Sequence, residues 1–167
     1  DKPFFRRTSN VITANGGNDL IQIGGAPANV DGGAGVDTLG LDQGVSLVAD
    51  TDGDGLADEV LATAGYTVNL TSGVITADGY GGSGIVANVE NVTGSLFADN
   101  LTGNEADNVL LGQDGNDVMI GLAGDDTLDG GIGNDQLRGD GLPDYTGPSG
   151  NDTLNCGDGN DIMWGGA

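Results

Sequence analysis

Histidine is absent from this 167-residue chain, and cysteine, aromatic residues and cations are all scarce. Without histidine there is no imidazole for zinc-protease motifs, for Ser-His-Asp or Cys-His catalysis, or for general acid–base chemistry. The single cysteine, Cys156, excludes an internal disulfide and zinc-finger spacing. An aromatic content of 4% makes a conventional globular core hard to build. No run is long and apolar enough to span a membrane, and no signal peptide is visible.

The charge of the chain is strongly one-sided, with 4 cations against 26 acids and a net charge of −22. Three cations lie in residues 1–7, and residues 1–9 differ so much from the rest that they read as a linker or an expression-derived end. Beyond them Arg138 is the only cation. Nucleic acid and anionic membrane surfaces are poor partners for such a chain. Its self-repulsion predicts disorder unless counterions bind specifically.

Glycine is abundant, with 34 residues, and much of it belongs to a nine-residue unit that recurs between Gly112 and Trp164. The unit reads small residue, two variable residues, Gly, Asn or Asp, Asp, a variable residue, a large apolar residue and a variable residue. The fourth position is glycine in Gly115, Gly124, Gly133, Gly150 and Gly159. The sixth position is Asp117, Asp126, Asp135, Asp152 and Asp161, and the eighth is Met119, Leu128, Leu137, Leu154 and Met163.

The unit predicts an all-β solenoid of parallel strands. Its glycines favour a tight turn over the first six positions, and the last three form a short strand with the eighth side chain pointing inward. Two units make a coil of eighteen residues, so sixth-position acids eighteen apart, such as Asp117 and Asp135, stack on one edge. Stacked carboxylates need a cation between them. Oxygen ligands of this kind suit calcium.

The same register extends to other parts of the chain. Residues 10–40 form a first block with Asp19 and Asp37 at the sixth position, and residues 94–167 form a second block that begins with Asp99 and Asn108. Between Leu137 and Leu154 the spacing is seventeen residues. We interpret residues 139–146 as a unit one residue short, which puts Asp144 eighteen residues after Asp126 and predicts that these two acids stack.

Residues 41–93 break the nine-residue count but keep alternating, β-branched segments. We interpret them as widened rungs of the same solenoid, so that residues 10–167 form one domain. A separate small β domain is the alternative. The stretch from Asn69 to Val74 predicts a hairpin or a tight corner.

An acidic loop within residues 41–93 resembles the start of an EF-hand loop. Acids occupy its first, third and fifth positions, a glycine follows, and the later ligands would be the Leu56 carbonyl and the side chain of Asp58. The twelfth position is Leu61 instead of a bidentate Glu, and no helices flank the loop, which leaves the last ligand open between Asp58 and Glu59. The alternative is an acidic, solvated turn. The acids at the first three ligand positions are Asp50, Asp52 and Asp54.

The nonapeptide resembles the RTX repeats of secreted bacterial proteins, which fold as a calcium-binding parallel β-roll or β-helix. The resemblance covers residues 10–40 and 94–167, and residues 41–93 only in general character. It implies several calcium ions, held by turn carbonyls, including those of the fourth-position glycines, and by sixth-position acids from turns two units apart. The implied pairs are Asp19/Asp37, Asp117/Asp135, Asp135/Asp152, Asp126/Asp144 and Asp144/Asp161, with Asp99/Asp117 and Asn108/Asp126 as terminal sites.

Two classes of function follow from the resemblance. The first is a calcium-dependent folding module or spacer in a larger adhesin, surface-layer protein or exoenzyme, exported by a type I system and located outside the cell or on its surface. The second is a carbohydrate-binding module like the repeats of alginate epimerases, with Tyr80, Tyr145 and Trp164 as aromatic faces for a surface glycan. We expect no catalysis, because metal coordination explains nearly every paired carboxylate. The chain ends in the opening of another repeat, which predicts a piece of a longer protein.

Overall fold

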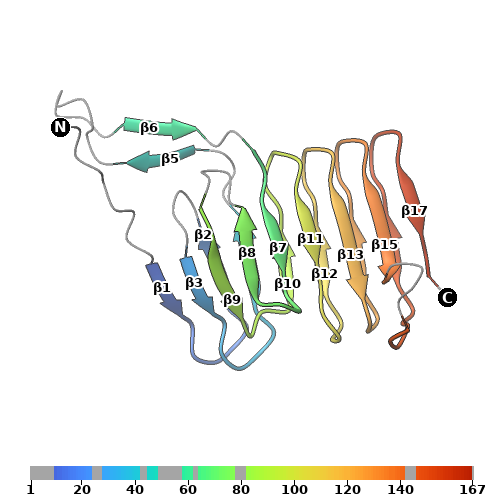
Figure 1. Ribbon diagram of the computed structural model, residues 1–167, viewed down its shortest axis with the longest axis horizontal. Helices are drawn as coiled ribbons and strands as arrows, with labels where there is room; N and C mark the ends of the chain where they lie inside the picture. Colours follow the sequence, from blue (N-terminus) through green and yellow to red (C-terminus); the bar gives the residue numbers. More distant parts are fainter. Residues whose placement is uncertain are drawn as a thin grey trace.

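The computed structural model describes residues 10–23, 28–41, 45–48, 58–61, 64–77, 82–141 and 146–166, and all regular elements in these ranges are β-strands. Most strands alternate between two long sheets that face each other, as Figure 1 shows for the coils at the C-terminal end. No helix in the described part of the chain is long and apolar enough to cross a membrane.

The larger sheet has nine strands and the smaller one has six. In spatial order, the nine-stranded sheet contains β1 (Asn10–Thr13), β3 (Ala28–Asp31), β9 (Gly84–Ala87), β8 (Val74–Ala77), β7 (Thr67–Asn69), β11 (Asn100–Thr102), β13 (Val118–Leu122), β15 (Gln136–Asp140) and β17 (Ile162–Trp164). The six-stranded sheet contains β2 (Leu20–Ile23), β4 (Thr38–Leu41), β10 (Asn91–Thr93), β12 (Val109–Leu111), β14 (Thr127–Asp129) and β16 (Thr153–Asn155). A separate antiparallel pair contains β5 (Val45–Val48) and β6 (Asp58–Leu61).

The eighteen-residue coil predicted from the sequence is confirmed in the register of the parallel strands. Leu101 of β11 pairs with Met119 of β13, and Met119 pairs with Leu137 of β15. These eighth-position side chains point between the sheets and are at most 1% exposed. In the second repeat block the core is therefore a narrow row of one inward side chain per strand, which a chain with few aromatic residues can build. The predicted fold class, an all-β parallel roll, is confirmed.

The central section widens only one of the two sheets. Between β3 and β11 the nine-stranded sheet holds β9, β8 and β7, whereas between β4 and β12 the six-stranded sheet holds β10 alone. Strands β7 and β8 are antiparallel, with Asn69 opposite Val74, so the hairpin predicted there is present. Its inward side chains include Val68 and Ile75, which are buried in the same core as the repeat strands.

The last coil corrects the interpretation of residues 139–146. Leu154 pairs with Leu128 and Met163 pairs with Leu137, so both spacings are 26 residues instead of eighteen. No shortened unit lies between β15 and β16 in the described residues; the chain makes one long turn there, of which residues 142–145 are not described. A longer turn costs little free energy, whereas a one-residue slip would move every inward side chain to the outside.

Candidate metal centres

The sixth-position side chains line up along two edges of the solenoid. The six-strand edge consists of the turns that lead into the strands of the six-stranded sheet, and the nine-strand edge consists of those that lead into the nine-stranded sheet. Along the six-strand edge the sixth-position residues are Asp19, Asp37, Glu90, Asn108, Asp126 and Asp152. Along the nine-strand edge they are Tyr66, Asp99, Asp117, Asp135 and Asp161.

Hydrogen bonds tie each sixth-position aspartate to the coil before it. The Asp99 N–H donates to Oδ1 of Asp117 at 2.8 Å, and the Asp117 N–H donates to Oδ1 of Asp135 at 2.8 Å. The same bond joins Asp19 to Asp37 at 2.8 Å. One carboxylate oxygen per turn is therefore used to hold the stack together.

The pairs in the last coil differ from those predicted. The Asp126 N–H donates to Asp152 at 3.0 Å, and the Asp135 N–H donates to Asp161 at 2.9 Å. The predicted pair Asp135/Asp152 is wrong, because Asp135 stacks with Asp161 and Asp152 stacks with Asp126. The pairs Asp126/Asp144 and Asp144/Asp161 rest on Asp144, which lies outside the described residues.

In six of the sixth-position aspartates, Oδ2 is buried without any hydrogen-bond partner. An ionised carboxylate is an acceptor on both oxygens, and a buried charge is costly unless it is paired. Burial raises the pKa of Asp117 and of Asp126 to about 7, against an ordinary value of 3.8. Neighbouring carboxylates contribute to this rise in pKa, and the backbone N–H that donates to each carboxylate opposes it. The unpartnered Oδ2 atoms belong to Asp19, Asp37, Asp117, Asp126, Asp135 and Asp152.

Five of these unpartnered oxygens, all except that of Asp19, lie close to a backbone carbonyl oxygen of the next coil. A Cβ on Gly112 would meet Oδ2 of Asp117 at 2.2 Å and the Gly130 carbonyl oxygen at 2.5 Å. A Cβ on Gly121 would meet Oδ2 of Asp126 at 2.2 Å in the same way. Two acceptors therefore converge at the first-position glycine of each turn. This donor set of carboxylate and carbonyl oxygens fits a calcium ion, which takes six to eight oxygens in flexible geometry.

The fourth-position glycines are required by the stacking of one turn on the next. A Cβ on Gly133 would lie 1.4 Å from the Gly115 carbonyl oxygen, and one on Gly159 would lie 1.5 Å from that of Gly133. A Cβ on Gly150 would lie 1.7 Å from the Gly124 carbonyl oxygen. These carbonyls point along the stack toward the next coil, and their role as calcium ligands stays a prediction.

Two predicted ligands are instead satisfied by the protein. Asp99 accepts hydrogen bonds from the Ser95 N–H at 2.6 Å, from the Ser95 hydroxyl at 3.1 Å and from the Tyr66 N–H at 2.5 Å. Asn108 accepts from the Asn104 N–H at 2.7 Å and donates to the Glu90 carbonyl at 2.7 Å. Neither residue has a buried oxygen without a partner, so donors of the protein itself satisfy both side chains in this coil.

We call a turn closed where N–H groups of the protein satisfy its sixth-position side chain, and open where one carboxylate oxygen of that side chain has no partner. The residue at the second position of the turn explains the difference. In the open turns other than that of Asp152 this residue has a positive φ, for example 79° at Gln113 and 91° at Leu122. Ser95 and Asn104 do not have a positive φ, and their N–H groups point at the sixth-position side chain. The identity of the second-position residue therefore distinguishes the two kinds of turn, but the nonapeptide pattern treats this position as variable.

Sequence reasoning also missed Glu90 and the role of the fifth position. Glu90 lies eighteen residues before Asn108, which was the available signal. At the fifth position, Oδ1 of Asn116 accepts the Asn134 N–H at 2.8 Å, and that of Asp107 accepts the Asp125 N–H at 2.8 Å. At the fifth position the later turn donates to the earlier one, whereas at the sixth position the earlier turn donates to the later one. Two sets of hydrogen bonds with opposite directions therefore join each pair of turns.

The acidic loop of the central section lies largely outside the described residues. Asp50, Asp52, Asp54 and Leu56 are not described, and Asp58 opens strand β6, opposite Val48. The proposed ligands of that loop stay predictions.

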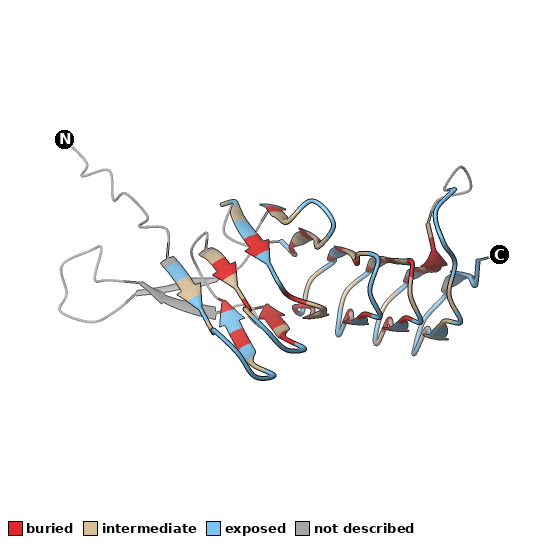
Figure 2. Cartoon of the chain, turned by 90° about the horizontal axis from the view of Figure 1, so that it is seen from below, coloured by how far each residue is buried: buried red, intermediate tan, exposed pale blue. Residues whose placement is uncertain are grey.

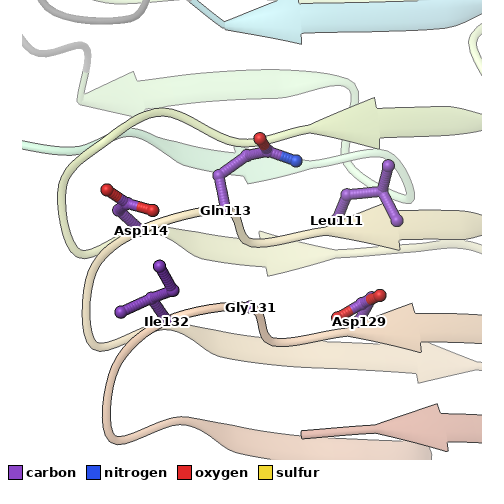
Figure 3. Close-up of a pocket in the computed structure, with 6 residues that line it drawn as sticks. All are labelled: Leu111, Gln113, Asp114, Asp129, Gly131 and Ile132. Atoms are coloured by element: carbon purple, nitrogen blue, oxygen red, sulfur yellow. The ribbon is translucent and has the colours of Figure 1, made fainter. Parts of the chain in front are cut away.

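A shallow depression lies on the outer surface between neighbouring coils, next to the turns of the nine-strand edge (Figure 3). It is lined by Leu111, Gln113, Asp114, Asp129, Gly131 and Ile132, and none of them is aromatic. Among the predicted glycan-binding residues, Tyr80 and Tyr145 are not described, and the guanidinium of Arg138 covers one face of Trp164 at 3.9 Å. The depression therefore offers no aromatic platform for a sugar.

Comparison with known families matches the second repeat block. Four copies of the RTX calcium-binding nonapeptide repeat match residues 93–128, 111–145 and 146–167. No curated protein shows significant similarity to the chain. The match covers the turns of Asp117, Asp126, Asp135 and Asp152, in which buried carboxylate oxygens and carbonyls converge. Residues 93–167 of this chain therefore belong to the RTX calcium-binding nonapeptide repeat family.

Proposed function

We propose that this chain is a structural module of a larger secreted bacterial protein, and that it folds only when calcium is bound. The observation that carries the proposal is the set of six buried carboxylate oxygens without a donor, five of which lie beside a backbone carbonyl oxygen of the next coil. Calcium would be held by Asp117, Asp126, Asp135 and their equivalents, together with turn carbonyls. The ion supplies positive charge that the chain, with 4 cations against 26 acids, lacks.

Metal binding then provides the free energy of folding. The apo chain has a net charge of −22 and a core of single side chains per strand, too little apolar burial to offset the entropy of ordering it. Because the sites do not exist before the coils stack, binding and folding are one process. Extracellular calcium-binding modules have dissociation constants of roughly 10⁻⁴–10⁻³ M. The module would be unfolded and exportable in a cytosol poor in calcium, and folded outside the cell.

Far-UV circular dichroism tests this proposal directly. We expect a coil spectrum in calcium-free buffer and a β spectrum at millimolar calcium. Magnesium at the same concentration should not replace calcium, because it demands a strict octahedral geometry and gives up its waters reluctantly. A β spectrum that is the same with and without calcium would show that the coils need no ion.

A matched pair of variants tests which acids take part. Asp117→Asn should raise the calcium midpoint and remove one ion, because Oδ2 of Asp117 has no partner in the protein. Asp99→Asn removes the same charge from the same edge but should leave the ion count unchanged, because Ser95 and Tyr66 already satisfy Asp99. Calorimetric calcium titration measures both. Equal losses in the two variants would contradict the assignment of open and closed turns.

A further inference from the structure

The junction between the two repeat blocks contains a turn that the nonapeptide pattern does not describe. Strand β4 of the first block pairs with β10, which directly precedes the second block, and the Asp37 N–H donates to Oε2 of Glu90 at 2.8 Å across 53 residues of chain. The Glu90 and Asn91 N–H groups donate back to the Asp37 carbonyl at 3.2 and 3.0 Å. Glu90 thus holds the place that a sixth-position aspartate holds in the regular coils.

Asp37 has the same unsatisfied oxygen as the acids of the repeat block. Its side chain is 0% exposed, its Oδ1 accepts the Asp19 N–H at 2.8 Å, and its Oδ2 is buried without a partner. A Cβ on Gly32 would meet this Oδ2 at 2.7 Å and the Asn88 carbonyl oxygen at 2.0 Å. The arrangement repeats that of Gly112 with Asp117 and Gly130, although the second coil here comes from a different part of the chain.

The turn that carries Asn88 and Glu90 is short and held in place. Only Asn88, Val89 and Glu90 lie between strands β9 and β10, where a regular turn has six residues. Asn88 has a φ of 50°, and its side-chain amide donates to Oδ1 of Asp31 at 2.8 Å. Its carbonyl is therefore fixed against the preceding coil. The longer side chain of Glu90 makes up for the missing length of the turn by reaching Asp37.

We propose that the Oδ2 of Asp37, the carboxylate of Glu90 and the carbonyl of Asn88 form a calcium site at this junction. The site rests on the proposed function, since it uses the same ion, but its residues lie outside the matched repeats at 93–167. It joins the last coil of the first block to the first coil of the second. Closing a long chain segment costs conformational entropy, and an ion shared between its two ends offsets that cost.

The test compares two variants of the full chain that remove the same charge. Glu90→Gln keeps an oxygen that can accept the Asp37 N–H but loses the anionic ligand. Glu105→Gln is the control, because Glu105 is an exposed turn residue outside the sixth position. Native mass spectrometry counts bound calcium during a titration. We expect one ion of the Glu90→Gln variant to need about tenfold more calcium, since affinity in such sites follows the number of charged ligands, and the Glu105→Gln variant to match the unmodified chain.

Two further measurements separate the possible outcomes. If Glu90→Gln does not fold, a β spectrum recovered at higher calcium supports a lost ligand, and a spectrum that calcium does not recover overturns the site. If Glu90→Gln and Glu105→Gln fill identically while Asp117→Asn loses an ion, the junction site is overturned and the proposed function stands. If the unmodified chain binds no calcium, the proposed function and the junction site fail together.

Discussion

At the scale of single residues, the stacking of turns decides where glycine is required. A Cβ on Gly131 would lie 2.0 Å from the Gln113 carbonyl oxygen of the coil before it. Gln113 also has a positive φ, yet it carries a side chain, because the turn before it, with Ser95 at the second position, has a different conformation. On the nine-strand edge a second-position side chain is therefore tolerated at Gln113, in the first open turn, and excluded at Gly131 and Gly157 in the turns that follow.

Two glycine variants separate backbone strain from steric conflict. Gly17 has a φ of 118° and open space where a Cβ would lie, so Gly17→Ala should cost only the strain, about 1–3 kcal/mol. Gly133→Ala adds a Cβ at 1.4 Å from a carbonyl oxygen and should cost more, because the two coils must separate. Urea unfolding at saturating calcium measures both. A smaller loss for Gly133→Ala than for Gly17→Ala would mean that the turns do not stack this closely.

At the scale of elements, the long turn before β16 interrupts an otherwise regular unit. The distance between the stacked acids Asp126 and Asp152 is 26 residues, against 18 for Asp117 and Asp135. The interrupted nonapeptide begins with Gly139 and Asp140 at the end of β15, and it resumes at Ser149 with its third to ninth positions. The insertion lengthens the path of the chain but leaves the stacked acids in register.

Deletion of residues 141–148 should restore a regular coil. The remaining sequence, Gly-Asp-Ser-Gly-Asn-Asp-Thr-Leu-Asn, is a complete nonapeptide. Because loop-closure entropy changes by only about 0.6 kcal/mol for each doubling of loop length, we expect a small gain in stability. The ion count should stay the same, since Asp126 and Asp152 still stack. Native mass spectrometry and a calcium titration check this; loss of an ion would show that the long turn itself supplies a ligand.

The β7–β8 hairpin sets the relation between the two blocks. It adds two strands to one sheet and none to the other, and neighbouring strands are spaced by about 4.8 Å. The two sheets therefore differ in width by roughly 10 Å across the junction. Figure 1 shows the result: β1 and β3 are tilted relative to β13 and β15, and Figure 2 shows the first block turned away from the line of the repeat coils. The hairpin bends the solenoid while its inward side chains keep the core continuous.

At the scale of the whole molecule, protons and calcium compete for the same buried carboxylates. Burial, the largest cause, raises the pKa of Asp117 and Asp126 to about 7 in the metal-free fold, and it raises the pKa of Asp135 and Asp152 as well. The folded chain therefore binds more protons than the unfolded chain between the ordinary value of 3.8 and about 7. The stability contributed by these protons is fully present below 3.8 and is lost as the pH rises through about 7.

Circular dichroism in calcium-free buffer checks this linkage. We expect more β structure at pH 5 than at pH 8, because protonation removes the repulsion that calcium otherwise removes. Calcium titrations should show the reverse trend, with a midpoint that rises as the pH falls below about 7. If calcium-free β content at pH 5 does not exceed that at pH 8, the buried carboxylates are not what keeps the apo chain unfolded.

The sequence by itself determined the nine-residue period, the eighteen-residue coil, the inward residues of the core and the oxygen ligands for a metal. Each of these depends on residues close together in the chain: the glycines that permit the turn, the inward Leu or Met and the acid two residues before it. Repetition of one local pattern is enough to specify parallel strands eighteen residues apart, as Leu101, Met119 and Leu137 show. The absence of cations to balance the acids then pointed to a bound metal.

Only the tertiary structure decided which acids meet and which are already satisfied. Asp152 stacks on Asp126 across 26 residues, an arrangement that spacing along the chain could not distinguish from a shortened unit. The carboxylate of Asp99 is already satisfied because the Ser95 N–H donates to it. Glu90 contacts Asp37 because the β7–β8 hairpin is accommodated within one sheet. These contacts join residues whose separation is set by the path of the intervening chain. A local pattern carries no information about where that path returns to the stack.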